Sequence, residues 1–126
     1  MYTDFLTRIR NAQAAKKETL KAPFSKMDMA IAELLAKKGY IERAEKKGRM
    51  PRRVIEVTLR YKDGVPAIQH VTLLSKSSRR LYAGYRELKK VRQGYGIAVV
   101  STPMGILESM DAKKKKVGGQ LLFELW

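Results

Sequence analysis

The chain contains no cysteine and only one histidine among its 126 residues. The missing thiols exclude disulfide frameworks, zinc ribbons and thiol catalysis. His70 has no second histidine and no cysteine with which to form a typical transition-metal site, and no serine lies in a nucleophile-elbow pattern. The few acidic residues show no pairing that indicates acid–base catalysis. We therefore expect neither an enzyme nor a bound metal, cofactor or small-molecule substrate.

Long apolar runs are also missing from the sequence. No stretch approaches the roughly 18 residues that a membrane-spanning helix needs, and residues 1–10 are polar and amphipathic, unlike a secretory signal. We therefore expect a soluble protein without a membrane partner. Because 44% of the residues are hydrophobic, a chain of this length can bury a core of its own.

Acidic residues are scarce beside basic ones: 12 Asp and Glu face 27 Lys and Arg, which gives a net charge of +15. In a chain with enough apolar residues to fold, this charge predicts a basic surface and a polyanionic partner. Each basic cluster alone is equally consistent with a solvated face, but three together favour phosphate contacts. The clusters are Lys37, Lys38, Arg43, Lys46, Lys47, Arg49, Arg52 and Arg53; Lys76, Arg79, Arg80, Arg86, Lys89, Lys90 and Arg92; and the lysines at 113–116.

Two helices are predicted in the first half of the chain. Apolar residues recur at helical spacing over residues 3–17, where Thr3 is the predicted N-cap. The second helix begins at Ser25, which forms a pattern like a capping box with Asp28, and it stops at Gly39. Three strands accompany these helices. They cover residues 19–23, 40–45 and 53–61, with a basic hairpin loop at 46–52.

The turn at Asp63-Gly64 marks a change in composition, so the predicted domains are residues 1–64 and 65–126. The first has the order α-β-α-β-β, and the second is mostly β with short helices, so the expected class is α+β with two small modules. In the second module, the predicted strands are 68–74, 79–82, 97–100 and 121–126, and the predicted helices are 87–92 and 109–116.

Two groups in the second module have the chemistry of nucleic-acid recognition. Ser101 and Thr102 end a rigid apolar strand, where short hydroxyls both donate and accept hydrogen bonds and allow close approach. Tyr82 stands among arginines such as Arg80, an arrangement that suits base stacking beside phosphate contacts, or equally a half-buried strand. Gly105, Gly118 and Gly119 serve either close approach or ordinary turn geometry.

Six segments carry a resemblance to a known family. They are DFLTRIRNA (4–12), PFSK (23–26), KGYI (38–41), RLY (80–82), GYGIAVVST (94–102) and VGG (117–119). In this order and spacing, the chain resembles the bacterial ribosomal small-subunit protein eight family along essentially its whole length.

The resemblance implies two α+β domains that bind the central domain of 16S ribosomal RNA early in assembly of the small subunit. It also implies contact with neighbouring small-subunit proteins and, in some members, with messenger RNA of the same operon. The expected RNA-binding residues of the C-terminal domain are Ser101, Thr102, Pro103, Gly105, Tyr82, Arg80, Gly118 and Gly119. Those of the N-terminal domain are Thr7, Arg8, Arg10, Asn11, Ser25 and Lys26.

This chain departs from the family pattern at several positions. Pro103 and Met104 stand where a serine and a basic residue are usual. Glu108-Ser109 replaces a Thr-Asp pair, which places a carboxylate near the expected RNA face and leaves Ser109 as the expected helix cap. The four lysines at 113–116 exceed the usual charge there.

Other functions remain open from the residues alone. An architectural DNA-binding protein or a regulatory mRNA-binding protein would share the basic charge, although the former usually presents an insertable wedge or symmetric arms. A small enzyme acting on an anionic substrate would need a convergent pocket with perturbed titratable groups.

Overall fold

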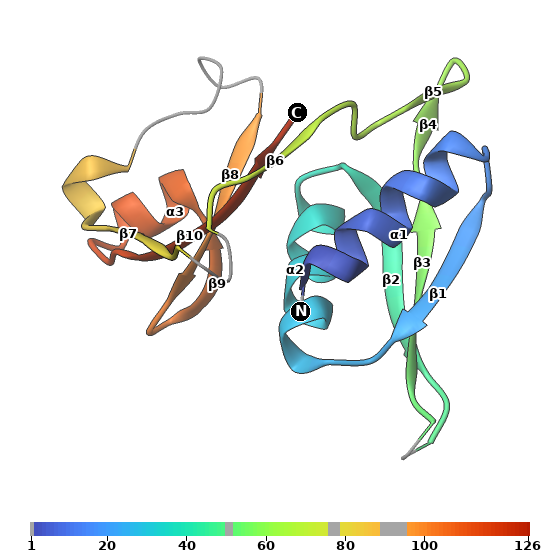
Figure 1. The fold of residues 1–126 in the computed structure, drawn as a ribbon, viewed down its shortest axis with the longest axis horizontal. Coiled ribbons are helices and arrows are strands. Elements are labelled where there is room, and N and C mark those ends of the chain that lie inside the picture. Colours follow the sequence, from blue (N-terminus) through green and yellow to red (C-terminus); the bar gives the residue numbers. More distant parts are fainter. Residues whose placement is uncertain (1, 50–51, 76–78, 89–95) are drawn as a thin grey trace. The chain divides into compact units, whose positions relative to one another are not determined.

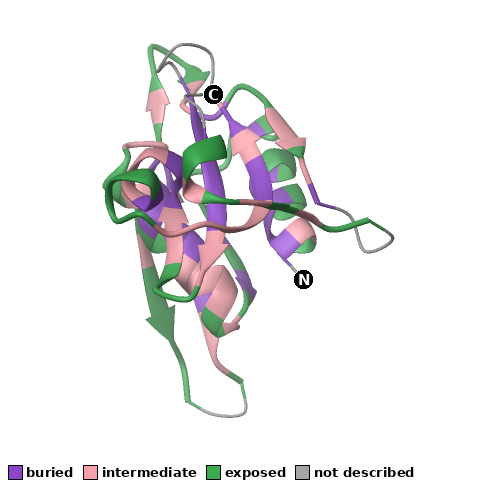
Figure 2. Ribbon diagram, turned by 90° about the vertical axis from the view of Figure 1, so that its left-hand side faces the viewer, coloured by how far each residue is buried: buried purple, intermediate pink, exposed green. Residues whose placement is uncertain are grey.

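The computed structural model describes residues 2–49, 52–75, 79–88 and 96–126. The chain forms two compact units, Met1–Ile68 and Gln69–Trp126. The first unit combines helices with a small sheet, whereas the second is mostly sheet, so the predicted α+β class is confirmed (Figure 1). In both units the buried residues lie mainly on the strands and on the inner sides of the helices (Figure 2).

In the first unit, two helices pack against a three-stranded antiparallel sheet of order β1-β3-β2. Ile55, Val57 and Leu59 of β3 are buried and alternate with less buried residues, which confirms the predicted period of two. The elements are α1 (Tyr2–Ala14), β1 (Thr19–Pro23), α2 (Lys26–Lys37), β2 (Ile41–Lys47) and β3 (Val54–Leu59), followed by the short hairpin of β4 (Tyr61–Lys62) and β5 (Val65–Pro66).

The predicted bounds of the first helix were wrong at both ends. The helix begins at Tyr2, so Thr3 lies inside it and is not the N-cap. It stops at Ala14 because Lys16 turns into the left-handed region, with φ of 55°. The Lys16 N–H donates to the Gln13 carbonyl and the Lys17 N–H donates to the Ala12 carbonyl, which together form a Schellman motif.

The second helix begins and ends as predicted. The Ser25 hydroxyl accepts a hydrogen bond from the Asp28 N–H at 3.0 Å. Gly39 adopts φ of 86° after the last turn, and the Tyr40 N–H donates to the Leu35 carbonyl at 2.9 Å. Both α1 and α2 therefore end in a Schellman motif, whose left-handed residue is a lysine after α1 and a glycine after α2.

Two turns of the first unit bear on the sequence predictions. Strand β2 continues to Lys47, and Lys46 and Lys47 pair with Ile55 and Val54, so the predicted loop at 46–52 began two residues too early. The Asp63-Gly64 turn is confirmed: both residues have positive φ and they join β4 to β5 in a two-residue hairpin. This turn lies inside the first unit, which extends to Ile68.

In the second unit, the central strand of the antiparallel sheet is β10 (Gly119–Leu125). It pairs along one edge with β6 (Val71–Leu73) and β7 (Leu81–Ala83), and along the other with β8 (Ile97–Thr102). Strand β9 (Gly105–Glu108) follows β8. The helix α3 (Ser109–Lys114) packs on β8, where Val100, Ala112 and Leu88 form a buried cluster.

Several predicted elements of this unit needed correction. The strand predicted at 97–100 includes Ser101 and Thr102, and the loop expected after it is a hairpin with β9, which the sequence analysis missed. The predicted helix at 109–116 stops at Lys114, and the terminal strand starts at Gly119. Near the predicted helix at 87–92 the chain forms a short 3-10 turn, Tyr85–Glu87, whereas residues 89–92 lie outside the described residues.

Candidate nucleic-acid interface

Strand register brings the C-terminal candidate residues to one end of the second sheet. Across the sheet, Tyr82 lies opposite Gln120, which lies opposite Ser101, which lies opposite Ile106. Cross-strand neighbours share a face and lie about 5 Å apart. At the very end of the sheet, Thr102 pairs with Gly105 and Gly119 pairs with Ala83. The sheet end therefore consists of Tyr82, Ser101, Thr102, Gly105 and Gly119, together with Gln120, which the sequence analysis did not select.

The two hydroxyls at this sheet end have different environments. The Thr102 hydroxyl donates to the Gly105 carbonyl at 2.8 Å and accepts from the Met104 N–H at 3.1 Å, so it holds the turn. Ser101 is half-buried, and its hydroxyl has no hydrogen-bond partner among the described residues. Ser101 can therefore offer both a donor and an acceptor to a ligand, whereas Thr102 retains one acceptor lone pair.

The turn between β8 and β9 is narrow and exposed. Gly105 has φ of 112°, a conformation that L side chains rarely adopt, although a Cβ there would meet nothing within 4 Å. Pro103 is exposed, and Met104 is 58% exposed. Together with Tyr82, which is 66% exposed, Met104 gives this sheet end two large uncovered side chains that suit contact with bases or sugars.

The glycine pair at the start of β10 is required by packing within the unit. A Cβ on Gly119 would contact the Ser101 carbonyl oxygen, and a Cβ on Gly118 would lie 2.7 Å from the Gly84 Cα and contact the Ala83 carbonyl oxygen. These glycines thus allow β10 to approach both neighbouring backbones. From the sequence, these glycines were predicted to serve close approach of a ligand or turn geometry, and this contact between strands was not predicted.

The role of Glu108 differs from the sequence prediction, which placed its carboxylate near the RNA face and made Ser109 the helix cap. Its carboxylate is buried and its Oε2 accepts from the Met110 N–H at 2.6 Å and from the Asp111 N–H at 3.2 Å. Glu108 is therefore the N-cap of α3, and Ser109 is the first helical residue instead of the cap. The carboxylate is used inside the protein, because the N–H groups of a helix's first turn have no acceptor within the helix.

We expect Glu108→Ala to lower the free energy of unfolding by about 1–2 kcal/mol, since it leaves two helix N–H groups without their acceptor. Urea denaturation measures the change. Glu108→Ser is the control: a shorter N-cap that keeps an acceptor should restore most of the loss. Equal losses for Ala and Ser would show that the cap contributes nothing.

The N-terminal candidates lie on α1 and at the start of α2. Arg8 lines two shallow cavities, one of about 220 Å³ shared with Ser25 and Asp28, and one of about 280 Å³ shared with Asn11. The Thr7 hydroxyl donates to the Thr3 carbonyl at 2.9 Å. Arg10 and Lys26 are exposed. The structure thus places Arg8 beside Ser25 in one cavity and beside Asn11 in the other, whereas the Thr7 and Ser25 hydroxyls also have local structural roles.

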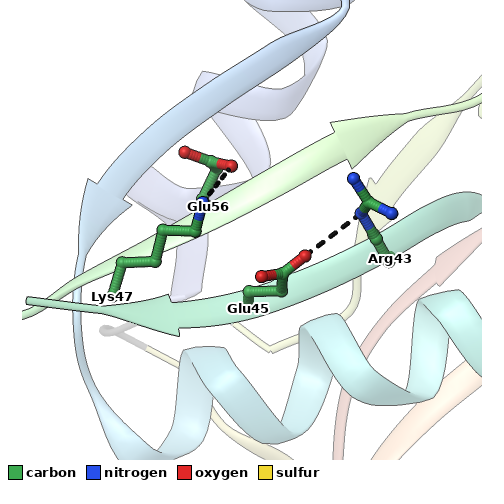
Figure 3. A network of polar contacts seen from close by, with 4 residues as sticks. All are labelled: Arg43, Glu45, Lys47 and Glu56. Atoms are coloured by element: carbon green, nitrogen blue, oxygen red, sulfur yellow. Dashed lines mark hydrogen bonds and ion pairs between the residues drawn. The ribbon is translucent and has the colours of Figure 1, made fainter.

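Carboxylates neutralise part of the first basic cluster on the outer face of β2 and β3 (Figure 3). Glu45 and Glu56 lie directly opposite each other. The Arg43 Nε lies 3.1 Å from a Glu45 oxygen, and the Lys47 Nζ lies 3.0 Å from a Glu56 oxygen. The hydrogen bond between Lys47 and Glu56 lowers the pKa of Glu56 and raises the pKa of Lys47. These cations balance opposing carboxylates, so this face is a weaker phosphate site than its lysine and arginine content suggests.

Two further cations of the same cluster lie over an aromatic ring. The Lys46 Nζ lies 5.6 Å and the Arg53 Cζ 5.5 Å from the centre of the Phe24 ring. Both distances fall within the range of cation–π attraction. Arg43, Lys46, Lys47 and Arg53 of the first cluster thus have partners inside the first unit, whereas the lysines at 114–116 are exposed without a carboxylate partner among the described residues.

The described residues contain no group of three acidic or histidine side chains that could hold a metal. His70 stacks on Trp126 with ring centres 4.5 Å apart, a structural role for the single histidine. No helix in the described part of the chain has both the length and the apolar character needed to cross a membrane.

These observations define a small, basic α+β protein with a polar, glycine-lined sheet end in its second unit. Residues 1–126 match the Ribosomal protein S8 family. The chain belongs to this family, which confirms the resemblance seen in the sequence.

Similar proteins in three organisms are each named Small ribosomal subunit protein uS8. The relative from Erythrobacter litoralis is 42% identical over 123 residues, which cover 98% of this chain and 94% of the relative. That from Dictyoglomus thermophilum has the same identity and coverage. That from Halorhodospira halophila is 42% identical over 119 residues, covering 94% of this chain and 91% of the relative.

Proposed function

We propose that this protein is a structural, non-enzymatic component of the small subunit of the cytoplasmic ribosome. In this role it binds the central domain of 16S rRNA and supports subunit assembly. Family membership and relatives named as small-subunit proteins support the setting. The observation that carries the RNA contact is the convergence of Ser101, Tyr82 and the narrow turn at one end of the second sheet.

The chemistry of this sheet end suits folded RNA. The free Ser101 hydroxyl can donate to and accept from base edges or 2′-hydroxyls in a wide, shallow minor groove. Tyr82 offers an exposed ring for stacking on an unpaired base, and Arg80, two residues earlier and exposed, can contact a phosphate. Pro103 and Gly105 keep the turn narrow enough to enter a groove.

The first unit supplies a second set of contacts in this proposal. Arg8, Asn11 and Lys26 reach the RNA backbone from the surface of α1 and the start of α2, with Thr7, Arg10 and Ser25 beside them. Neighbouring small-subunit proteins are the expected protein partners. A messenger RNA of the same operon would bind at the same sheet end if it presents a similar fold.

Ser101→Ala tests the proposal directly, because it removes one free hydroxyl without disturbing a hydrogen bond inside the protein. We expect affinity for a transcript of the 16S central domain to fall about tenfold, the cost of about one hydrogen bond, while affinity for unrelated duplex RNA changes less than twofold. A gel-shift competition at near-physiological salt measures both. Thr102→Ser, which keeps the turn-holding hydroxyl, is the matched control and should bind like the unmodified protein.

Three outcomes would contradict the proposal. Equal losses for specific and unrelated RNA would make the sheet end a scaffold. Unmodified protein that binds duplex DNA as well as the central-domain transcript would favour an architectural DNA-binding function. No preference for the central-domain transcript over other folded RNA would refute the assigned target.

A further inference from the structure

We propose that the C-terminal end of α3 is an additional phosphate-binding site, formed by Lys114, Lys115 and Lys116, that extends the RNA contact of the second sheet. This inference rests on the proposed function, because it assigns a further part of the surface to the same RNA.

The four lysines at 113–116 divide into one with a partner inside the unit and three without a carboxylate partner among the described residues. The Lys113 Nζ donates to the Leu88 carbonyl at 3.2 Å, so this ammonium group is committed inside the unit. Lys114, Lys115 and Lys116 are exposed, and none has a carboxylate partner among the described residues. Three ammonium groups on consecutive residues, with no carboxylate partner among the described residues, thus concentrate positive charge at the C-terminal end of α3.

The lysines lie close in sequence to the sheet end that we propose binds RNA. Lys116 is followed by Val117 and then by Gly118, which packs against Ala83 and Gly84. Gly119 pairs with Ala83 and lies against the Ser101 backbone. The lysines therefore immediately precede the segment that packs against the Ser101 backbone, and in this proposal an RNA strand bound at Ser101 continues toward them.

Lys116 occupies a backbone conformation that favours glycine. Its φ is 56°, its N–H donates to the Lys113 carbonyl, and the Val117 N–H donates to the Ala112 carbonyl. The equivalent position of α2 holds Gly39, with φ of 86° and the same two hydrogen bonds to its own helix. Lysine is strained in this conformation and glycine is not.

The helix dipole does not account for Lys116. A cation near a helix C-terminus is stabilised by about half a negative charge there, but Lys113, Lys114 and Lys115 already lie in or beside the last turn. Three free ammonium groups also outweigh this partial charge, so the end of α3 attracts phosphate.

Lys116→Gly distinguishes a role of Lys116 in RNA binding from a role in stability. The substitution removes one positive charge and also relieves the strain of the left-handed backbone. We expect the midpoint of thermal unfolding to rise by about 3 °C. We also expect the affinity for the central-domain transcript to fall about fivefold at 150 mM salt, and the slope of log K against log salt to become shallower by about 0.9. Stability and RNA affinity thus change in opposite directions.

Lys16→Gly is the matched control. Lys16 is also left-handed, also ends a helix with a Schellman motif, and is not among the proposed RNA contacts. This variant should gain the same stability with an unchanged salt slope, and Lys116→Arg should keep both slope and affinity. An unchanged slope in Lys116→Gly, or an equal change in Lys16→Gly, would overturn the phosphate site. If the unmodified protein does not prefer the transcript, the proposed function itself fails.

Discussion

Gly119→Ala should destabilise the second unit by about 3 kcal/mol or more, because the new methyl group has no space. Its Cβ would contact the Ser101 carbonyl oxygen and lie 2.9 Å from the Ser101 carbonyl carbon. Both are backbone atoms of a strand paired on its other side with β9, so neither moves without breaking the sheet. Because Ser101 would have to shift, the same variant should also lose preference for the central-domain transcript.

Gly84→Ala is the matched control for this prediction. Gly84 is exposed, its φ is −75°, and a Cβ on it would meet nothing within 4 Å. Alanine should be tolerated there within about 1 kcal/mol. Urea denaturation followed by circular dichroism measures both variants. A loss below about 1 kcal/mol in Gly119→Ala would mean that β10 approaches β8 less closely than described.

RNA affinity should fall about 250- to 1000-fold between 50 and 200 mM salt, since roughly five or six neutralised phosphates give a slope of about −4 to −5. The net charge of +15 supplies the cations. Arg43 and Lys47 form ion pairs with Glu45 and Glu56, so they are less available for phosphate contacts. These pairs involve only part of the first cluster. Filter binding of the central-domain transcript over a salt series measures the slope.

Ser101→Ala provides the control for the salt series, because it removes a hydroxyl and no charge. Its line should run parallel to that of the unmodified protein at lower affinity. A slope shallower than about −2 for the unmodified protein would show that phosphate contacts do not dominate binding.

Local features of the sequence were sufficient to predict much of the first unit. The period of β3, the cap at Ser25 and the stop at Gly39 each depend on neighbouring residues along the chain. The end of α1 was missed because the left-handed residue is Lys16, which carries no glycine signal. The predicted loop at 46–52 began too early, because strand pairing with β3 holds two lysines in β2.

The candidate site was predictable in its residues but not in its assembly. Ser101 and Thr102 could be selected from their place after an apolar strand. That Gln120 lies between Ser101 and Tyr82 depends on strand register, and the irregularity between Leu121 and Phe123 shifts the pairing with β8. The cap at Glu108 was missed because glutamate is an uncommon N-cap, and a hairpin instead of a loop precedes it.

The stack of Trp126 on His70 makes the second unit optically distinct. Trp126 is the only indole in the sequence, and both rings belong to Gln69–Trp126. Indole fluorescence, excited at a wavelength that tyrosine does not absorb, therefore follows the unfolding of that unit alone, whereas circular dichroism follows both units. The chain thus carries its own reporter for asking whether its two halves unfold together or in sequence.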